Sequence, residues 1–309
     1  MRLCRGVNET AHRFRTAAPA LALVLVALLG LGFQVQLPRA FPSEADYRSV
    51  GRALAEDRAA GDVVLLHPWW TERARLFVPQ DIPVVGYLGE TADDLVEHPR
   101  IWVLANERFP WMPDADFRQH FLPERSPLGA ERRFGPLTLT PYRNGRARKV
   151  LLSAADVFDR LEASVEEPGG AAPLPCRRVG ARMVCPHDAS VEVAWHEVLY
   201  QPVRCLLVVP PAGGRSLDVR IPDGPAAEEL LVEAGIIWEH AWIPGRADVQ
   251  LQLESPVGVL HARIPGGQEG FVRARTPATP AGPWTLRLRT ANPQDRQTCL
   301  RLRALGGPP

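Results

Sequence analysis

The 309-residue sequence lacks the short motifs with which several large enzyme classes bind phosphates or activate a nucleophile. It contains no G-x-G-x-x-G and no G-x-x-x-x-G-K-[ST], the glycine-rich loops that hold nucleotide phosphates. It also contains no G-x-S-x-G, the nucleophile elbow of α/β-hydrolases. We therefore expect no nucleotide and no other cofactor to bind.

Charge of a single sign is lacking too. The 36 Lys and Arg residues nearly balance the 35 Asp and Glu residues, which leaves a formal net charge of +1. Lysine occurs once, as Lys149, so arginine carries nearly all of the positive charge. Acidic and basic residues are interspersed, and no basic patch follows the pattern of a phosphate backbone. Nucleic acid is therefore not an expected partner.

Cysteine is scarce, but its placement is informative. Four of the five cysteines fall in the C-terminal half, at Cys176, Cys185, Cys205 and Cys299. There is no C-x-x-C and the spacings fit no common zinc site, so we expect disulfides and no metal. Four cysteines allow three pairings. Cys176 and Cys185 flank a short predicted hairpin, so the local solution pairs them and leaves Cys205 with Cys299.

One long apolar run stands near the N-terminus. Residues 17–37 contain no charged side chain and reach the ~20 residues that cross a bilayer as a helix. Arginines outnumber acids before the run, a bias that keeps residues 1–16 in the cytoplasm. This pattern predicts a single-pass protein of the bacterial inner membrane, with residues 17–37 as the transmembrane helix and the bulk of the chain in the periplasm.

A cleaved signal peptide is the alternative interpretation of the same run, because it also has a basic start and an apolar core. Two features argue against it. The run is longer than the usual signal core of about 7–15 residues. The candidate cleavage site, Pro38-Arg39-Ala40, places proline where a small residue is wanted. Both interpretations place the rest of the chain outside the cytoplasm, where disulfides persist.

Residues 43–145 show strands alternating with short helices. Ser43 is a predicted N-cap for a helix over 46–60, and Asp62–Leu66 is an unbroken apolar run typical of a strand buried on both faces. Further strands are predicted over 84–87, 101–104 and 133–142, with helices over 92–96 and 114–121. This alternation predicts a small Rossmann-like α/β domain with a parallel sheet.

Residues 150–305 have a different texture. Short runs with an apolar–polar alternation of period two, such as Val249-Gln-Leu-Gln-Leu253, are separated by turns rich in proline and glycine. About eight such strands predict an all-β unit, an antiparallel β-sandwich or jelly roll linked by disulfides. The helical-looking piece over 226–232 is interpreted as a loop turn.

The candidate ligand-binding residues are His67, Trp69, Trp70 and Glu72. They follow the strand at Asp62–Leu66, and ligands of open α/β sheets bind at the carboxyl ends of the strands. Two tryptophans beside a carboxylate and an imidazole suit the stacking and hydrogen bonding of a sugar ring. The alternative is that the tryptophans fill the space between sheet and covering helix. Trp238 and Trp242, which bracket Glu239-His240, also suit a sugar but equally suit the core or rim of a sandwich.

Parts of the chain resemble known proteins. The segments A-A-G-D-V-V-L-L-H-P-W-W, R-I-W-V-L and F-G-P-L-T-L-T-P-Y-R, within 43–143, resemble the periplasmic α/β domain of membrane glycosyltransferases of the dolichyl-phosphate-mannose mannosyltransferase type. The later C-x8-C, C-L-L-V-V-P-P, A-G-I-I-W and T-C-L-R-L resemble a galactose-binding-like β-sandwich. Those enzymes have many membrane helices with catalytic acids on the outer loops. This sequence has one apolar run, so no catalytic residue carries over and the implied role is accessory.

These observations predict a non-catalytic protein that binds a glycan or a partner protein during assembly of envelope polysaccharide or glycolipid. A multi-spanning glycosyltransferase is a possible protein partner. One alternative is a glycosyltransferase or glycan hydrolase whose site uses His67 and Glu72 at the strand end. The other is a structural envelope protein without a ligand.

Overall fold

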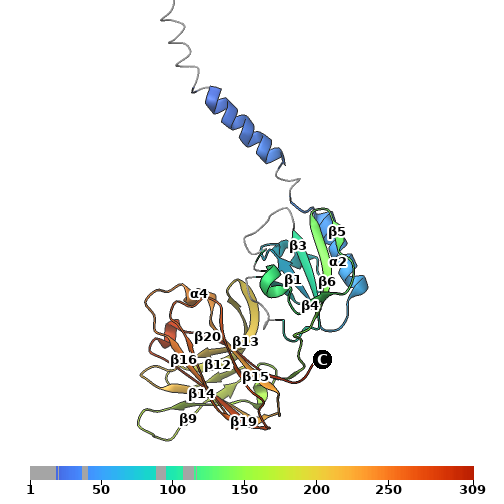
Figure 1. Ribbon diagram of the computed structural model, residues 1–309. Coiled ribbons are helices and arrows are strands. Elements are labelled where there is room, and N and C mark those ends of the chain that lie inside the picture. Colours follow the sequence, from blue (N-terminus) through green and yellow to red (C-terminus); the bar gives the residue numbers. More distant parts are fainter. Residues whose placement is uncertain (1–18, 20, 37–40, 88–94, 107–114, 116) are drawn as a thin grey trace, which may run out of the picture. The chain divides into compact units, whose positions relative to one another are not determined.

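The computed structural model describes residues 19, 21–36, 41–87, 95–106, 115 and 117–309. The chain divides into two compact units, which are drawn in Figure 1. Unit 1 comprises Met1–Thr91 and Arg100–Arg143, and unit 2 comprises Ala92–Pro99 and Asn144–Pro309. Each unit has its own hydrophobic core and is described separately.

The predicted transmembrane helix over 17–37 is wrong. Among the described residues, no helix is both long and apolar enough to cross a membrane. The helical stretch in this region covers residues 21–36. The sequence estimate reached a full span by counting residues on both sides of this stretch, some of which lie outside the described residues.

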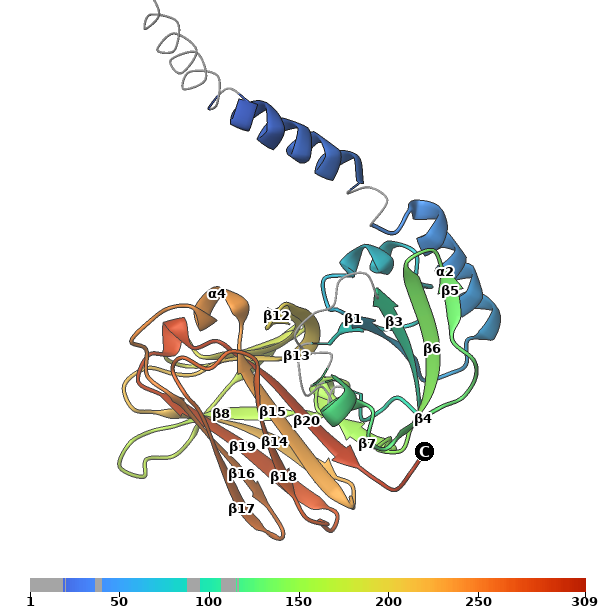
Figure 2. The same ribbon diagram turned by 45° about the horizontal axis from the view of Figure 1, so that its top comes forward.

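Helix α2 (Glu44–Asp57) begins where the sequence predicts, because its first turn contains a capping box. The Ser43 hydroxyl accepts a hydrogen bond from the Asp46 amide (3.2 Å), and the Asp46 carboxylate accepts one from the Ser43 amide (2.7 Å). The buried face of the helix carries Tyr47, Val50 and Leu54. These side chains pack against Val64 and other residues of the sheet, so α2 covers one of its faces (Figure 2).

The sheet of unit 1 is built around the predicted buried strand. Strand β1 lies between β2 and β3 and is parallel to both, and the order across the sheet is β2-β1-β3-β6-β4, with β5 paired to β6. The bounds are β1 (Asp62–His67), β2 (Val84–Gly86), β3 (Arg100–Asn106), β4 (Arg125–Pro127), β5 (Arg132–Phe134) and β6 (Leu137–Asn144). All six residues of β1 are buried. The prediction of a strand covered on both faces is therefore confirmed.

The predicted Rossmann-like parallel sheet is wrong. Strand β6 is antiparallel to β3, and β5 is antiparallel to β6, so the sheet is mixed. Of the helix expected over 114–121, the described residues 115 and 117–121 are helical, the latter as a π-helical turn, η2 (Phe117–Phe121). The helix predicted over 92–96 lies largely outside the described residues.

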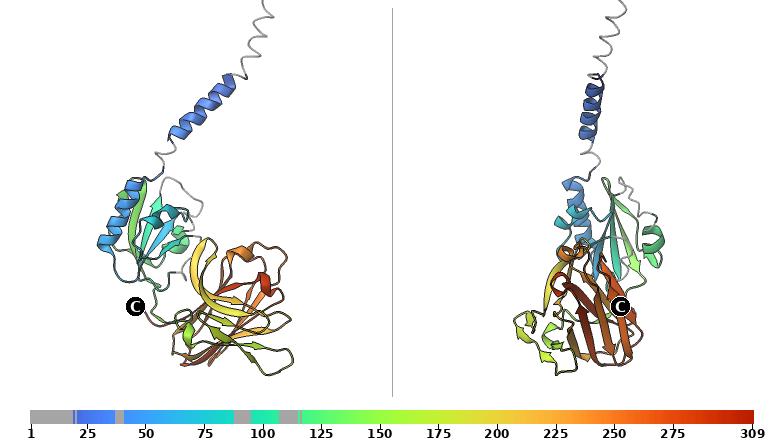
Figure 3. Two further views of the ribbon diagram at one scale, coloured as in Figure 1. Left: turned by 180° about the vertical axis from the view of Figure 1, so that it is seen from behind. Right: turned by 90° about the vertical axis from the view of Figure 1, so that its left-hand side faces the viewer.

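Unit 2 is an antiparallel β-sandwich, seen from two sides in Figure 3. One sheet has eight strands in the order β10-β11-β12-β13-β20-β15-β18, with β7 paired to β20. The other has six strands in the order β17-β16-β19-β14-β8-β9. The strands of the two sheets together are β7 (Val150–Ser153), β8 (Glu162–Glu166), β9 (Leu174–Pro175), β10 (Arg177–Val179), β11 (Arg182–Val184), β12 (Ser190–Val198), β13 (Gln201–Val209), β14 (Ser216–Gly224), β15 (Glu229–Ile236), β16 (Val249–Ser255), β17 (Gly258–Ile264), β18 (Phe271–Thr276), β19 (Gly282–Thr290) and β20 (Thr298–Leu305).

The core of the sandwich comes from the period-two alternation of these strands. Leu217, Val219 and Ile221 point inward from one sheet, and Leu230 and Val232 point inward from the other. Strand β15 starts within the stretch that the sequence analysis interpreted as a loop turn, so that interpretation is wrong for its second half. The fold as a whole is therefore mostly β, with few helices.

Both predicted disulfides are present in unit 2. Cys176 is bonded to Cys185 and Cys205 to Cys299. The first pair closes the β10–β11 hairpin, which explains why local pairing succeeds. The second joins neighbouring strands β13 and β20, where Leu207 is the register partner of Cys299.

Candidate functional site

The end of β1 lies between two layers. Val64 and Leu66 face α2, whereas His67, one residue on, points to the opposite face because strand side chains alternate. Turn η2 covers that opposite face, and the right-hand view of Figure 3 shows α2 and η2 on either side of the sheet. The strand end is therefore enclosed on the side to which His67 points.

His67 is a core residue. Only 7% of it is exposed, and its ring stacks on Phe117 with centroids 4.3 Å apart. Tyr87 meets the same ring edge-on at 5.6 Å, and Phe121 extends the stack beyond Phe117 at 4.6 Å. We call His67, Tyr87, Phe117 and Phe121 the His67 cluster. Its geometry is that of packed aromatic rings, so His67 contributes to the hydrophobic core of unit 1.

Trp69 and Trp70 are closer to solvent. Their rings meet edge-to-face with centroids 6.0 Å apart, Trp69 is half-buried, and Trp70 is 37% exposed. The residues on either side of this pair are hydrogen-bonded to each other: the buried Thr71 hydroxyl donates to the carbonyl oxygen of Pro68 at 2.9 Å. The two tryptophans therefore form a pair on a locally fixed turn, and Trp70 presents part of its ring to solvent.

Glu72 opens the short 3-10 helix η1 (Glu72–Leu76) and forms an ion pair within it. Arg75 donates from Nη2 to Glu72 Oε1 at 3.1 Å and from Nε to Oε2, and it also donates to the carbonyl oxygen of Val84. Glu72 thus joins η1 to strand β2 through Arg75. The structure brings Trp69 to Trp70 and His67 to Phe117, but it places Glu72 against Arg75.

The buried acid of this strand is at its other end. Asp62 accepts hydrogen bonds from Arg100 Nε (2.7 Å), Trp102 Nε1 (2.9 Å) and the Ala59 amide (2.9 Å). Burial by itself would raise the pKa of Asp62, but these hydrogen bonds and the Arg100 charge outweigh it and hold the pKa below its usual value. Asp62 is therefore a structural carboxylate that joins β1 to β3.

Unit 2 carries a second group of aromatic side chains that the sequence analysis only partly identified. Tyr200 lies in the two-residue turn between β12 and β13, where Leu199 and Tyr200 both have positive φ (48° and 60°). Trp238 begins the short helix α4 (Trp238–Ala241), and Trp242 directly follows it. We call Tyr200, Trp238 and Trp242 the aromatic platform.

The rings of the aromatic platform touch one another and are partly open to solvent. Trp238 lies 4.3 Å from Tyr200 and 4.8 Å from Trp242, centroid to centroid. Trp242 is 52% exposed and Tyr200 is 38% exposed. Large aromatic side chains that meet one another yet remain in water are typical of a surface that a ligand or partner covers. No sequence pattern pairs Tyr200 with the tryptophans, because they belong to segments far apart in the chain.

A buried arginine holds the loops around the platform. Arg296, fully buried, donates from Nε to the Ala247 carbonyl (2.8 Å), from Nη1 to that of His240 (3.2 Å) and from Nη2 to that of Gly266 (2.9 Å). Burial lowers the pKa of Arg296, but a guanidinium stays charged far above neutral pH. Its rigid fork therefore joins the end of α4, the following loop and the β17–β18 turn at the same end of the sandwich (Figure 2).

No metal centre is found in the part of the chain that the structure describes, since no group of three or more His, Cys, Asp or Glu side chains lies close enough to hold an ion. The ring of His187 lies 2.7 Å from the carboxylate of Glu167, which Arg215 also binds at 2.9 Å. Hydrogen bonds from Arg215 are the main reason that the pKa of Glu167 lies below its usual value.

No protein-family model matches the chain, and no curated protein does. Several solved structures are similar in part. The CBM51-2 and INT domains of Clostridium perfringens ZmpB share 9% identity over 37% of this chain and 25% of that chain, with a TM-score of 0.26. The tandem CBM51 modules of a family 98 glycoside hydrolase from Streptococcus pneumoniae share 9% over 55% of this chain and 56% of that chain, with a TM-score of 0.29. The CBM22-1 xylan-binding domain of Paenibacillus barcinonensis Xyn10C shares 12% over 52% and 93%, with a TM-score of 0.24.

These neighbours contain carbohydrate-binding modules, but at such TM-scores they carry no argument about this chain. The chain spans a quarter of the first of them and just over half of the second. None of the comparisons supports the glycosyltransferase resemblance of residues 43–143. The β-sandwich itself rests on the two sheets and the core described above.

Proposed function

We propose that the chain is a non-catalytic glycan-binding protein and that the aromatic platform of unit 2 is its binding surface. The observation that carries this proposal is a cluster of three partly exposed aromatic rings at one end of a β-sandwich, in which Trp238 contacts both Tyr200 and Trp242. A sugar presents an apolar face of C–H groups and a rim of hydroxyls. Tyrosine and tryptophan match both, because each has a flat apolar ring and a polar tip.

Energy and rigidity both favour this surface. Leaving a large aromatic side chain in water forgoes about 1.5–3 kcal/mol of burial, which a ligand that covers the ring recovers. Arg296 fixes the backbone around α4 through its hydrogen bonds to three loops. A fixed platform loses little conformational entropy on binding, so more of the stacking energy becomes affinity.

The strand-end residues His67, Trp69, Trp70 and Glu72 are a second candidate glycan site. The exposed ring of Trp70 beside Trp69 favours it. His67 would not contact a glycan at such a site, because its ring packs against Tyr87 and Phe117. Its role there would be to support the turn that carries the two tryptophans. An enzyme that used His67 and Glu72 together would need to expose the first and release the second from Arg75, so the structure favours binding over catalysis at this position.

We further propose that unit 2 works in an oxidising compartment outside the cytoplasm, the bacterial periplasm, where the ligand is an envelope polysaccharide or glycolipid. The two disulfides support this location, because such bonds persist in oxidising compartments and are rare in the cytosol. When protein purified from the native host is alkylated without reduction, Cys176, Cys185, Cys205 and Cys299 should remain unalkylated, because disulfide-bonded sulfurs do not react. Four free thiols in that sample would contradict the location.

A glycan array probed with the full chain tests the binding surface. Trp242→Ala should weaken binding by about 1–3 kcal/mol, roughly 5- to 150-fold, because it removes the most exposed ring of the platform. Trp195→Ala is the matched control, since Trp195 is 68% exposed on β12 and lies outside the platform. Loss of binding with Trp70→Ala and not with Trp242→Ala would move the site to the strand end. Unchanged binding by all three variants would exclude both sites.

A further inference from the structure

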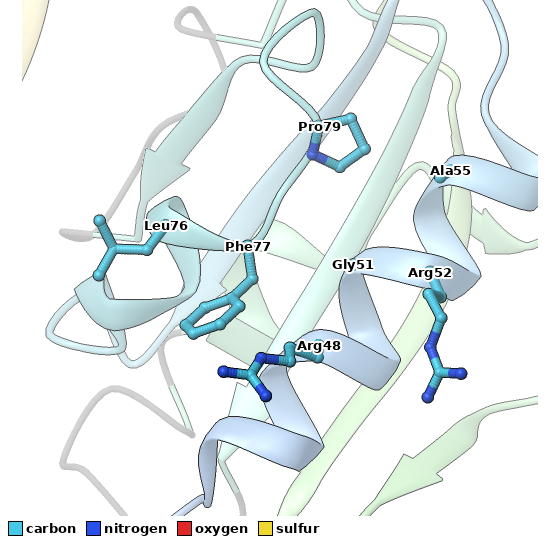
Figure 4. A pocket seen from close by; sticks show the side chains of 7 residues that line it. All are labelled: Arg48, Gly51, Arg52, Ala55, Leu76, Phe77 and Pro79. Carbon is cyan, nitrogen blue, oxygen red and sulfur yellow. The ribbon is translucent and has the colours of Figure 1, made fainter.

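A groove in unit 1 has a composition unlike that of the aromatic platform. It has a volume of about 550 Å³ and lies between helix α2 and the end of η1 (Figure 4). The residues that line it are Arg48, Gly51, Arg52, Ala55, Leu76, Phe77 and Pro79. Arginines stand on its helix side, and apolar side chains form its other side. No part of the proposed glycan function uses it.

The floor of the groove depends on a glycine. A Cβ atom at Gly51 would lie 2.3 Å from the carbonyl oxygen of Phe77, so α2 approaches the end of η1 this closely only because residue 51 has no side chain. Phe77 is held in place by stacking on Tyr47, with ring centroids 5.6 Å apart and an angle of 12°. The groove therefore has a rigid base built from two packed elements.

Its apolar wall is exposed to an unusual degree. Leu76 is 79% exposed, more than any other large apolar side chain among the described residues, including those of the helical stretch over 21–36. A single exposed leucine is ordinary on a protein surface. Here it stands at the edge of a groove whose floor is also apolar, which is the arrangement of an anchor site for a partner side chain.

The rim carries an excess of positive charge. Glu44 is shared by Arg48 (3.0 Å) and Arg73 (2.6 Å). Within the residues that the structure describes, Arg52 donates to the Ser49 hydroxyl at 3.2 Å and has no acidic partner. Glu56 lies one turn beyond Arg52 on α2 and does not line the groove. The charged residues that line the groove are both arginines, Arg48 and Arg52, and of the two only Arg48 is paired with a carboxylate, that of Glu44.

We propose that the groove docks an acidic segment of a partner protein that carries an apolar anchor residue. The anchor would pack on Leu76 and Phe77, and its flanking carboxylates would pair with Arg48 and Arg52, whose planar guanidinium groups bind carboxylates in two-point contacts. Charge complementarity selects this occupant, since a basic or purely apolar segment would supply no carboxylate to Arg52. This surface is independent of the aromatic platform, so either proposal can fail without the other.

Panning of a random peptide library on the immobilised full chain tests the proposal. Enriched peptides should combine Asp or Glu with a large apolar residue, and their affinity should fall as salt is raised. Binding of the synthesised peptides, measured by fluorescence anisotropy, should weaken about tenfold or more with Arg52→Glu and with Leu76→Ser. The matched controls are Arg133→Glu and Leu128→Ser, which change exposed residues of unit 1 outside the groove and should leave binding unchanged.

Three outcomes would overturn the proposal. The first is a library that yields only peptides without acidic residues. The second is equal weakening by the groove variants and by the controls. The third is a homodimer, detected by sedimentation, that Leu76→Ser dissociates, because the occupant would then be a second copy of this chain. Since all four changed side chains are exposed, each variant is expected to fold, and circular dichroism checks this.

Discussion

The His67 cluster and the aromatic platform are built from similar side chains but differ in what surrounds them. In the first, η2 covers the strand end and His67 is only 7% exposed. In the second, Trp242 stands on a loop at the end of the sandwich and is 52% exposed. Aromatic residues next to a strand end are thus no indication of a binding surface by themselves. Whether they form a binding surface or part of the core depends on whether another element packs over them.

The two clusters also differ in how their surroundings are held. The His67 cluster lies in unit 1, where apolar packing between sheet and helices supplies the stability. The aromatic platform lies in unit 2, where Arg296 and the two disulfides add fixed cross-links to the core. A loop that presents exposed rings has little apolar packing of its own, so it needs such constraints to keep one conformation.

The largest expected effect is the loss of unfolding free energy when a disulfide is removed, because only unit 2 contains these bonds among the described residues. Replacing Cys205 and Cys299 by serine should lower the free energy of unfolding of unit 2 by about 4.7 kcal/mol, because the bond closes a long loop, whereas the short Cys176–Cys185 loop contributes about 2.7 kcal/mol. Hydrogen exchange in denaturant should show faster exchange in β13 and β20 and unchanged exchange in β1. Equal acceleration in β1 would show that the two units do not unfold separately.

The next effect tests the burial of the His67 cluster. Phe117→Ala should cost about 3–5 kcal/mol of unfolding free energy, since Phe117 is 8% exposed and stacks on both His67 and Phe121. Chemical denaturation measures the loss. Trp242→Ala, the equivalent change in the platform, should cost about 1 kcal/mol or less. If the two costs were similar, the distinction between a core cluster and a surface platform would be lost.

A buried carboxylate in unit 2 gives a pH-dependent effect of similar size. Glu233 is fully buried and accepts hydrogen bonds from Arg273 (3.1 Å) and Arg303 (2.6 Å), with Arg301 Nε 3.3 Å away. Burial would raise the pKa of Glu233, but the charges of Arg301, Arg303 and Arg273 outweigh it and hold the pKa below its usual value. Glu233→Gln should therefore cost about 3 kcal/mol at neutral pH, because it leaves buried guanidinium charge uncompensated.

The sign of that pH dependence follows from the lowered pKa. Ionised Glu233 contributes its full stabilisation above the unfolded-state pKa of about 4.3, and the contribution is lost as the pH falls towards the lower pKa of the folded state. The gap in unfolding free energy between wild type and Glu233→Gln should be constant near neutral pH and shrink below about pH 4.3. A gap that widens on acidification would contradict the assignment.

The smallest effect is expected at the strand end. Trp70→Ala should change the unfolding free energy by about 0.5 kcal/mol or less, because the ring is 37% exposed and meets the ring of Trp69 edge-to-face. It should leave glycan binding unchanged if the aromatic platform is the binding surface. Thermal denaturation and the same glycan array measure both. A loss of several kcal/mol would mean that Trp70 belongs to the core, the alternative that the sequence leaves open.

Local signals explain which predictions were confirmed. The apolar run at Asp62–Leu66 predicts a strand covered on both faces, and the capping box at Ser43 predicts a helix start, since each depends on neighbouring residues alone. The pairing of Cys176 with Cys185 follows from a hairpin of ten residues, and the other pair follows by elimination. Period-two alternation likewise predicts the strands of unit 2.

Predictions that depend on a distant segment were wrong or incomplete. The direction of β6 relative to β3 depends on how the chain returns after β3, which no local pattern records. The apolar run near the N-terminus predicted a membrane span, but no helix among the described residues is long and apolar enough to be one.

The sequence by itself therefore determined about eight strands of the sandwich but not β15, together with the buried central strand of unit 1, the helix cap and the disulfide pairing, because each follows from hydrophobic period, capping chemistry or local spacing. Only the tertiary structure decided that His67 is enclosed by Phe117, that Glu72 pairs with Arg75, and that Tyr200 packs against Trp238. Hydrophobic period records which side chains face a core. It does not record which distant segment packs over them, and that packing separates a core cluster from a binding surface.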